Sequence, residues 1–407
     1  MRKSCGNATG DKRGARTEYL VTNSGSTSGR IPQLDGLRGI AILLVICLHY
    51  LNDAEHGAFG SFLYRFGCCF RLGWAGVDLF FVLSGFLIGG ILLDARAASN
   101  YFSTFYIRRF FRILPIYYLW VTLFVFAALF FGNSVGGVVP NDLSALKLLP
   151  VYYLFVQNYF SLPIWTFAWL WLAVAWSLGI EEQFYLISPP LVRFLSIQKL
   201  KLVLLGTLIF APVLRAALFL LWTAGKNAMY VWMPCRADSL AMGVLVALLW
   251  REGKIQPWYA AHRTAFYVLL AVLAAPIPFC IKWLFSASAF WMGFLGYSWL
   301  ALLFAFLLVL SLLEPQGIWS RNLQWPFLRE MGRLSYCVYL IHLLVLGLCH
   351  ALMLHHRPSI ASVRGALVTL FAFGISYFLA LLSWRFFEHP LLRRGHVRQY
   401  KFSESDA

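Results

Sequence analysis

Charged residues are scarce in this chain of 407 residues, since Asp, Glu, Lys and Arg together make up only 13% of it. An average soluble domain contains about 25% of them. Hydrophobic residues make up 60%, and several apolar runs reach the roughly 20 residues that cross the hydrocarbon core of a bilayer. This composition excludes an ordinary soluble protein. It predicts an all-α, polytopic transmembrane helix bundle embedded in the lipid bilayer.

The chain also lacks the patterns of several other protein classes. Its eight cysteines show no spacing typical of a disulfide framework or a zinc site, and we expect neither a bound metal nor a bound cofactor. The Lys and Arg residues behind the net charge of +17 are dispersed between apolar runs, so nucleic acid is not expected as a partner. Nothing in the sequence indicates an oligomeric state.

About ten spans are predicted from the apolar runs. They are approximately residues 34–52, 73–93, 112–132, 170–192, 202–222, 232–250, 265–285, 290–313, 335–354 and 364–386. Lys and Arg are concentrated in alternate connections, as in cytoplasmic loops, which predicts that both termini are cytoplasmic. We expect a disordered basic cytoplasmic tail over residues 1–30, a membrane domain over 31–392 and a cytoplasmic tail over 393–407.

The first span, LDGLRGIAILLVICLHY, contains Asp35, Arg38 and His49. Ionisable groups inside a membrane are costly and usually mark a functional site. Arg38 and His49 are separated by almost three whole helical turns, so both lie on one stripe, about 16 Å apart along the axis. Asp35 lies one turn before Arg38 on the same stripe. The span therefore presents a guanidinium near the cytoplasmic face and an imidazole near the outer face.

Two further spans bring ionisable residues to the depth expected for His49. Asp78 lies near the outer end of the second span, in GVDLFFVLSGF. Arg236 and Asp238 lie at a similar level in the sixth span, in RADSLAMG. Such groups are tolerated in a membrane only where they face one another or a water-filled cavity. We therefore expect a polar cluster near the outer face.

Arg109 and Arg112 lie one turn apart at the expected start of the third span, in RRFFRILP. Guanidinium groups in such a row are suited to a phosphate-bearing ligand. Arginines at a cytoplasmic helix end can also be simple membrane anchors. The spacing leaves both interpretations open.

Glu181 is expected near the middle of the bilayer, in WSLGIEEQFYL of the fourth span. Ser177 and Tyr185 share its helix face, although the carboxylate is equally suited to pairing with an arginine across the bundle. His342 of the ninth span has the sequence context of a hydrogen-bonded bundle residue more than that of a catalyst. Glu388 is compatible with a simple helix end before a proline.

An imidazole can accept a proton from a hydroxyl near neutral pH, and an arginine cluster can hold a phosphorylated donor. Together they predict group transfer from a cytosolic donor to an acceptor on the far side of the membrane. A transporter or flippase for a lipid-linked sugar or another anion also needs buried charges. It is disfavoured because no internal repeat relates the two halves of the chain. In a sensor or assembly protein without catalytic activity, nothing requires Arg38 and His49 to lie on one stripe of the helix.

Seven segments resemble, in their order along the chain, the signature segments of the bacterial acyltransferase 3 family: LDGLRGIAILLVICLHY, GVDLFFVLSGFLIGGIL, RRFFRILP, WSLGIEEQFYL, RADSLAMG, LSYCVYLIHLLVL and FFEHPL. The family comprises integral-membrane O-acyltransferases that modify lipopolysaccharide, other surface polysaccharides, Nod factors and some macrolides. The resemblance implies acyl-CoA, commonly acetyl-CoA, as co-substrate, a carbohydrate or glycolipid acceptor, and a bacterial cytoplasmic (inner) membrane. It also implies the stand-alone form, without the fused esterase-like domain of some members.

By this resemblance the Arg-x10-His motif falls on Arg38 and His49, and the Arg-x-x-Arg motif falls on Arg109 and Arg112. The acidic residue of the family's fourth span falls on Glu181. The expected site residues are His49, Asp78 and Glu181 for catalysis, Arg38, Arg109 and Arg112 for the donor, and Asp35, Arg236 and Asp238 for the acceptor side.

The mechanistic hypothesis is that His49 is the general base, with Asp78 or Asp35 as its orienting partner. Direct transfer and a covalent acyl-His intermediate are both compatible with the motif. Glu182 is the alternative to Glu181 as the family's acidic residue. The loop from 132 to 167, rich in aromatic residues, is expected to contribute to an acceptor cleft or to form part of an interfacial aromatic belt.

Overall fold

The fold is known from a computed structural model, which describes residues 31–51, 62–131, 149–160, 170–222, 225–283 and 286–402. Every regular element in these ranges is a helix, so the predicted all-α class is confirmed. The expected tail over residues 1–30 lies outside the described residues. So do residues 132–148 and 161–167, which are most of the loop expected at the acceptor cleft.

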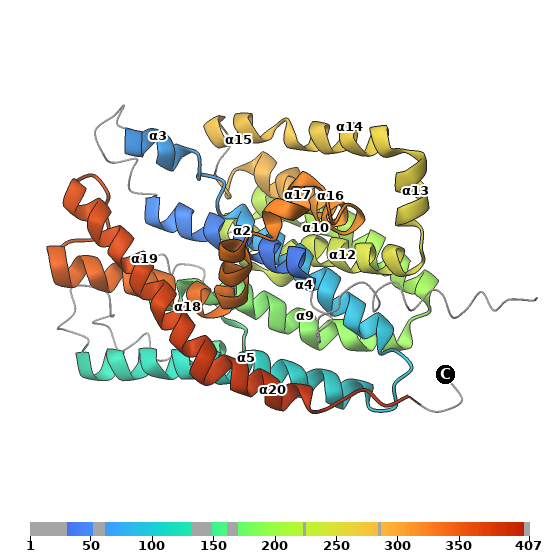
Figure 1. Cartoon of the computed structure of the whole chain (residues 1–407), viewed down its shortest axis with the longest axis horizontal. Coiled ribbons are helices and arrows are strands. Elements are labelled where there is room, and N and C mark those ends of the chain that lie inside the picture. Colours follow the sequence, from blue (N-terminus) through green and yellow to red (C-terminus); the bar gives the residue numbers. More distant parts are fainter. Residues whose placement is uncertain are drawn as a thin grey trace, which may run out of the picture. The chain divides into compact units, whose positions relative to one another are not determined.

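Figure 1 shows the arrangement of the helices. The long ones are α2 (Pro32–Leu51), α4 (Ala75–Asp94), α5 (Tyr101–Phe131), α9 (Ala175–Phe194), α10 (Ile197–Leu221), α12 (Met233–Arg251), α14 (Arg263–Ala274), α16 (Tyr297–Leu313), α18 (Pro326–Leu354) and α19 (Val363–Ser383). The short ones are α3 (Phe62–Cys68), α6 (Leu149–Tyr153), α7 (Gln157–Phe160), α8 (Leu170–Ala173), α11 (Gly225–Val231), α13 (Ile255–Ala261), α15 (Ile277–Trp283), α17 (Ile318–Leu323), α20 (His389–His396) and the π-helices η4 (Met292–Gly296) and η5 (Trp384–Glu388).

Within the described ranges, nine helical stretches are long and apolar enough to cross a membrane. They coincide with nine of the predicted spans. The remaining predicted span, residues 170–192, corresponds to α8 and α9. Helix α9 has 20 residues, but Glu181, Glu182 and Gln183 at its centre lower its hydropathy. The polytopic bundle is therefore confirmed, while the orientation of its termini stays a prediction.

The arginines of the third predicted span lie inside a helix and not at its start. Helix α5 begins at Tyr101, two turns before Arg109. Helix α20 packs on this part of α5, as Figure 1 shows. The boundary expected between residues 392 and 393 falls within α20, and Lys401 accepts a hydrogen bond from the backbone N–H of Ser99, beside the start of α5. The C-terminal segment thus lies next to these arginines.

Glycines allow the helices around the site to approach closely. Gly85 of α4 and Gly243 of α12 face each other, and a methyl group at either position would overlap backbone atoms of the other helix. At a second crossing, a methyl group at Gly332 of α18 would overlap the carbonyl of Asp35 in α2. These two crossings fix α4 against α12 and α2 against α18. The polar residues described below lie on these four helices and on α5, α9, α10, α16 and α19.

Candidate active site

A pair of histidines joins α2 to α18. Nδ1 of His49 lies 2.9 Å from Nε2 of His342, and the ring centroids are 5.0 Å apart. The Tyr50 hydroxyl donates a hydrogen bond to the carbonyl of His342 at 3.1 Å and contacts the Ser376 hydroxyl of α19 at 3.1 Å. The sequence predicted a hydrogen-bonded role for His342, but it gave no sign that the partner would be His49.

The carboxylates expected to orient His49 have other partners. Asp78 accepts a hydrogen bond from Arg236 at 2.6 Å and one from Ser239 at 3.1 Å. Asp35 forms an ion pair with Arg38, at 3.9 Å, and it lies about 21 Å from His49 along α2. His342 therefore occupies the place that the sequence assigned to Asp78 or Asp35, because the neighbour of His49 is set by the crossing of two helices and not by spacing along one.

Two ion pairs lie side by side where α4, α10 and α12 meet, and all four side chains are fully buried. Arg236 pairs with Asp78 and lies over the ring of Tyr297, 3.8 Å from its centroid. Arg215 pairs with Asp238 at 2.9 Å. The expected polar cluster of Asp78, Arg236 and Asp238 thus exists, and its members satisfy one another's charge.

Arg215 was missed as a cluster member by sequence reasoning. It is the one arginine within the apolar stretch of α10, and an ionisable residue in such a position is itself a signal. Its guanidinium also donates to the carbonyls of Gly293 and Cys235 and to the Ser298 hydroxyl at 2.8 Å. These contacts make it a brace between α10, α12 and the start of α16.

Glu181 is the centre of a second polar group, formed by residues from four helices. It accepts hydrogen bonds from Ser84 of α4 at 2.9 Å and from Tyr185 of α9 at 3.2 Å. Both Arg38 of α2 and Arg112 of α5 interact with it electrostatically. The structure therefore brings two of the three arginines expected at the donor site together with the carboxylate of the fourth predicted span.

Arg109 lies beside this group. Its guanidinium is 5.9 Å from the ring centroid of Tyr185 and interacts electrostatically with Arg112, Glu182 and Tyr400. Glu182, the alternative to Glu181, is therefore the acidic neighbour of Arg109, whereas Glu181 is the neighbour of Arg112. Both members of the Arg-x-x-Arg motif thus face the same region of α9.

Polar side chains connect the two ends of this site. Ser177 lies one turn before Glu181 on α9, and its hydroxyl is 2.7 Å from that of Tyr339 on α18. Tyr339 in turn lies one turn before His342. We call the series Glu181, Ser177, Tyr339, His342 and His49 the polar seam. It runs between the arginines and His49 along three helices that are otherwise packed with apolar residues.

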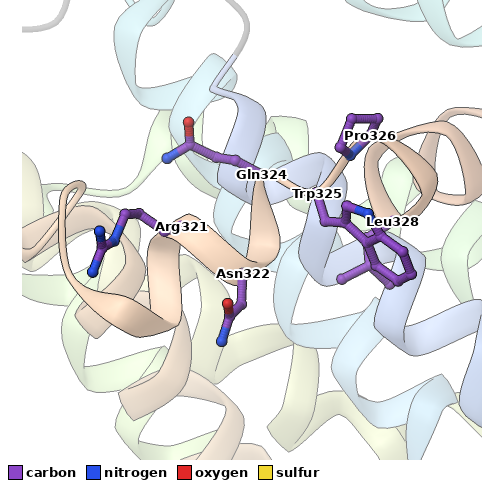
Figure 2. Close-up of a pocket in the computed structure, with 6 residues that line it drawn as sticks. All are labelled: Arg321, Asn322, Gln324, Trp325, Pro326 and Leu328. Atoms are coloured by element: carbon purple, nitrogen blue, oxygen red, sulfur yellow. The ribbon is translucent and has the colours of Figure 1, made fainter.

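A surface hollow of about 470 Å³ lies at the junction of α17 and α18. Figure 2 shows its lining, which consists of Arg321, Asn322, Gln324, Trp325, Pro326 and Leu328. None of the residues predicted for the site lines it. The candidate site is therefore defined by the polar seam and the arginines, and not by this hollow.

Comparison with known proteins gives a consistent set of relatives. A family model described as an acyltransferase domain matches residues 31–385. The peptidoglycan O-acetyltransferase of Listeria monocytogenes is 28% identical over 395 residues, which cover 91% of this chain and 57% of the relative. A putative O-acetyltransferase of Staphylococcus aureus is 26% identical over 376 residues, which cover 90% of this chain and 58% of the relative.

A putative peptidoglycan O-acetyltransferase of Bacillus subtilis is 27% identical over 391 residues, with 90% of this chain and 55% of the relative covered. The chain thus spans little more than half the length of these relatives. No solved structure matches it.

Proposed function

Because the chain belongs to the acyltransferase family whose model spans residues 31–385, we propose that it is a membrane O-acetyltransferase. The donor is acetyl-CoA, taken from the cytoplasm, and the acceptor is a hydroxyl of a cell-wall polysaccharide at the extracytoplasmic side. The names of the relatives favour a peptidoglycan-type glycan as acceptor. The observation that carries the proposal is the polar seam, which links a cluster of arginines to His49 through the bundle.

The arginine end of the seam suits the phosphates of coenzyme A. Arg38, Arg109 and Arg112 converge from α2 and α5, and charge-assisted hydrogen bonds from guanidinium to phosphate are among the strongest available to a protein. Glu181 interacts electrostatically with Arg38 and Arg112, so its carboxylate balances part of their positive charge before the donor arrives. The pantetheine arm then has to extend along the seam for about 16 Å, the axial distance between Arg38 and His49.

The transfer takes place at the histidine end. His49 accepts the proton of the acceptor hydroxyl while the oxygen attacks the thioester carbonyl of acetyl-CoA. The C–S bond breaks, the coenzyme A thiolate leaves, and the imidazolium of His49 gives it the proton. The products are the acetyl ester and coenzyme A in its thiol form. They are the same if the acetyl group first rests on His49 as a covalent intermediate.

The test is acceptor-dependent release of coenzyme A by the purified chain in liposomes. Acetyl-CoA labelled in the acetyl group is supplied with peptidoglycan fragments, and the fragments are analysed by mass spectrometry for the added acetyl group. The His49→Ala variant is expected to fold and to lose transfer. Release of no coenzyme A by the wild-type chain, together with movement of an intact glycan across the membrane, would identify a transporter instead.

A further inference from the structure

His342 is fully buried, and its hydrogen-bond partners decide which ring nitrogen carries its proton. Nδ1 of His342 lies 2.8 Å from the carbonyl oxygen of Tyr339 and 3.2 Å from that of Val338. A carbonyl oxygen can only accept hydrogen bonds. The hydrogen of the neutral His342 ring is therefore on Nδ1, and its Nε2 carries a lone pair.

This assignment determines the proton position on His49. Nε2 of His342 can only accept a hydrogen bond, and the atom facing it at 2.9 Å is Nδ1 of His49. Nδ1 of His49 must therefore donate and carry the hydrogen. A neutral imidazole has one N–H group, so the lone pair of His49 lies on Nε2. The carbonyl of Val45, which also contacts the His49 ring, is likewise an acceptor.

We propose that His342 is a positioning residue that holds His49 in the tautomer with Nδ1 protonated and Nε2 free to accept the proton of the acceptor hydroxyl. The catalytic consequence rests on the proposed function, whereas the tautomer itself does not. The position of His342 is fixed, because its ring is hydrogen-bonded to backbone carbonyls of α18. Its own carbonyl accepts a hydrogen bond from the Tyr50 hydroxyl.

A neutral partner suits this location better than a carboxylate does. A carboxylate beside His49 would be a further buried charge within a membrane-spanning helix, and such charges are costly. Two neutral imidazoles and the hydroxyls of Tyr50 and Ser376 place no formal charge at this end of the seam before reaction. The charge appears only when His49 accepts a proton and is removed when that proton passes to the leaving thiolate.

The first arm of the test compares two substitutions of His342 in the full chain. His342→Gln can present an amide oxygen near the position of Nε2 and so retains an acceptor for Nδ1–H of His49, whereas His342→Leu removes it. The Leu variant is expected to lower kcat about 10- to 100-fold with KM for acetyl-CoA unchanged. The Gln variant is expected to recover most of this loss.

His350 supplies the matched control. It is also fully buried on α18, two turns beyond His342, but its Nε2 contacts Thr369 of α19 at 2.9 Å. His350→Leu and His350→Gln are expected to leave kcat unchanged among folded molecules. If both His342 variants behave like the wild type, or if both lose activity equally with a changed KM, the positioning role is refuted.

The second arm needs no variant of His342 and no activity. Magic-angle-spinning NMR of the wild-type chain, with ring-¹⁵N histidine, reports which nitrogen of each imidazole is protonated, and loss of a signal in His49→Ala identifies His49. A protonated Nδ1 and a bare Nε2 support the proposal, and a protonated Nε2 overturns it. This result stands even if the wild type releases no coenzyme A, so failure of the proposed function and failure of the tautomer assignment are distinguishable.

Discussion

Removing the carboxylate of Asp78 is expected to destabilise the chain, because it leaves Arg236 buried without a counter-charge. Both side chains have an exposed fraction of 0%, and their closest atoms are 2.6 Å apart. Breaking one half of such a buried pair costs about 3 to 5 kcal/mol. Two further nitrogens of Arg236, Nε and Nη1, already have no hydrogen-bond partner among the described residues. The truncation would leave the cation with its contact to the Tyr297 ring, so we expect the upper part of this range for Asp78→Ala.

Two additional variants separate charge from shape. Asp78→Asn keeps an oxygen for Arg236 and for Ser239 but removes the negative charge, and we expect it to cost about 1 to 3 kcal/mol. The double variant Asp78→Ala, Arg236→Leu removes both charges, and it is expected to be more stable than Asp78→Ala alone. This order of stabilities among the three variants is expected only if the two residues form a structural ion pair.

The assay is reversible unfolding of the purified chain in mixed micelles, followed by tryptophan fluorescence, with acetyl transfer measured per folded molecule. The structural interpretation predicts that Asp78→Asn loses folded protein and retains kcat. An Asp78→Ala variant as stable as the wild type would refute the energetic reasoning. A fully folded Asp78→Asn variant without activity would instead support the catalytic role that the sequence predicted for Asp78.

Three further outcomes follow from other parts of the structure. Arg112→Ala is expected to raise KM for acetyl-CoA about 10- to 100-fold, because one charge-assisted contact to phosphate is lost; an unchanged KM would remove Arg112 from the donor site. Gly85→Ala is expected to cost about 1 to 3 kcal/mol of stability in the same unfolding assay, since its methyl group would overlap the Leu240 carbonyl of α12; the matched Gly206→Ala, where nothing lies within 4 Å, should be neutral or stabilising. The third outcome concerns Glu252, whose pKa is lowered from its ordinary 4.5 by hydrogen bonds from Lys201 and Lys254. It should stabilise the wild type over Glu252→Gln by up to about 1 kcal/mol at pH 7, and the difference should vanish as the pH falls from 4.5 through the lowered pKa; a difference that persists in acid would contradict this linkage.

The positions of the spans and the alignment of Arg38 with His49 could be predicted from the sequence, because each depends on residues within a single helix. Hydropathy over about 20 residues locates a span regardless of its neighbours, and α9 departs from this rule only because Glu181 and Glu182 lie at its centre. The alignment of Arg38 with His49 follows from helix periodicity alone. The start of α5 was placed too late because its first two turns contain Ser103, Arg108 and Arg109, which resemble a loop by composition.

The partners of the polar residues could not be predicted, since they depend on which helices cross and at what height. Asp78 meets Arg236 because two glycines let α4 and α12 approach closely, and no spacing within either helix encodes that encounter. His49 meets His342 across almost three hundred residues of chain. For the same reason the sequence assigned His49 a carboxylate as its orienting partner, which is the usual partner of a catalytic histidine.

The partners that the structure does show explain how a proton acceptor is maintained inside a membrane-spanning helix. The formal charges at the helix crossings of α4, α10 and α12 cancel in pairs, Asp78 with Arg236 and Asp238 with Arg215, and these pairs are closed to solvent. Among the described residues, the polar contacts of the His49 ring are His342 and the carbonyl of Val45, neither of which is an acidic group. A carboxylate beside the imidazole would favour the imidazolium before reaction, and an imidazolium has no lone pair to accept the proton of the acceptor hydroxyl. The separation of the two ion pairs from the histidine pair therefore keeps a lone pair on His49 available for the acceptor hydroxyl.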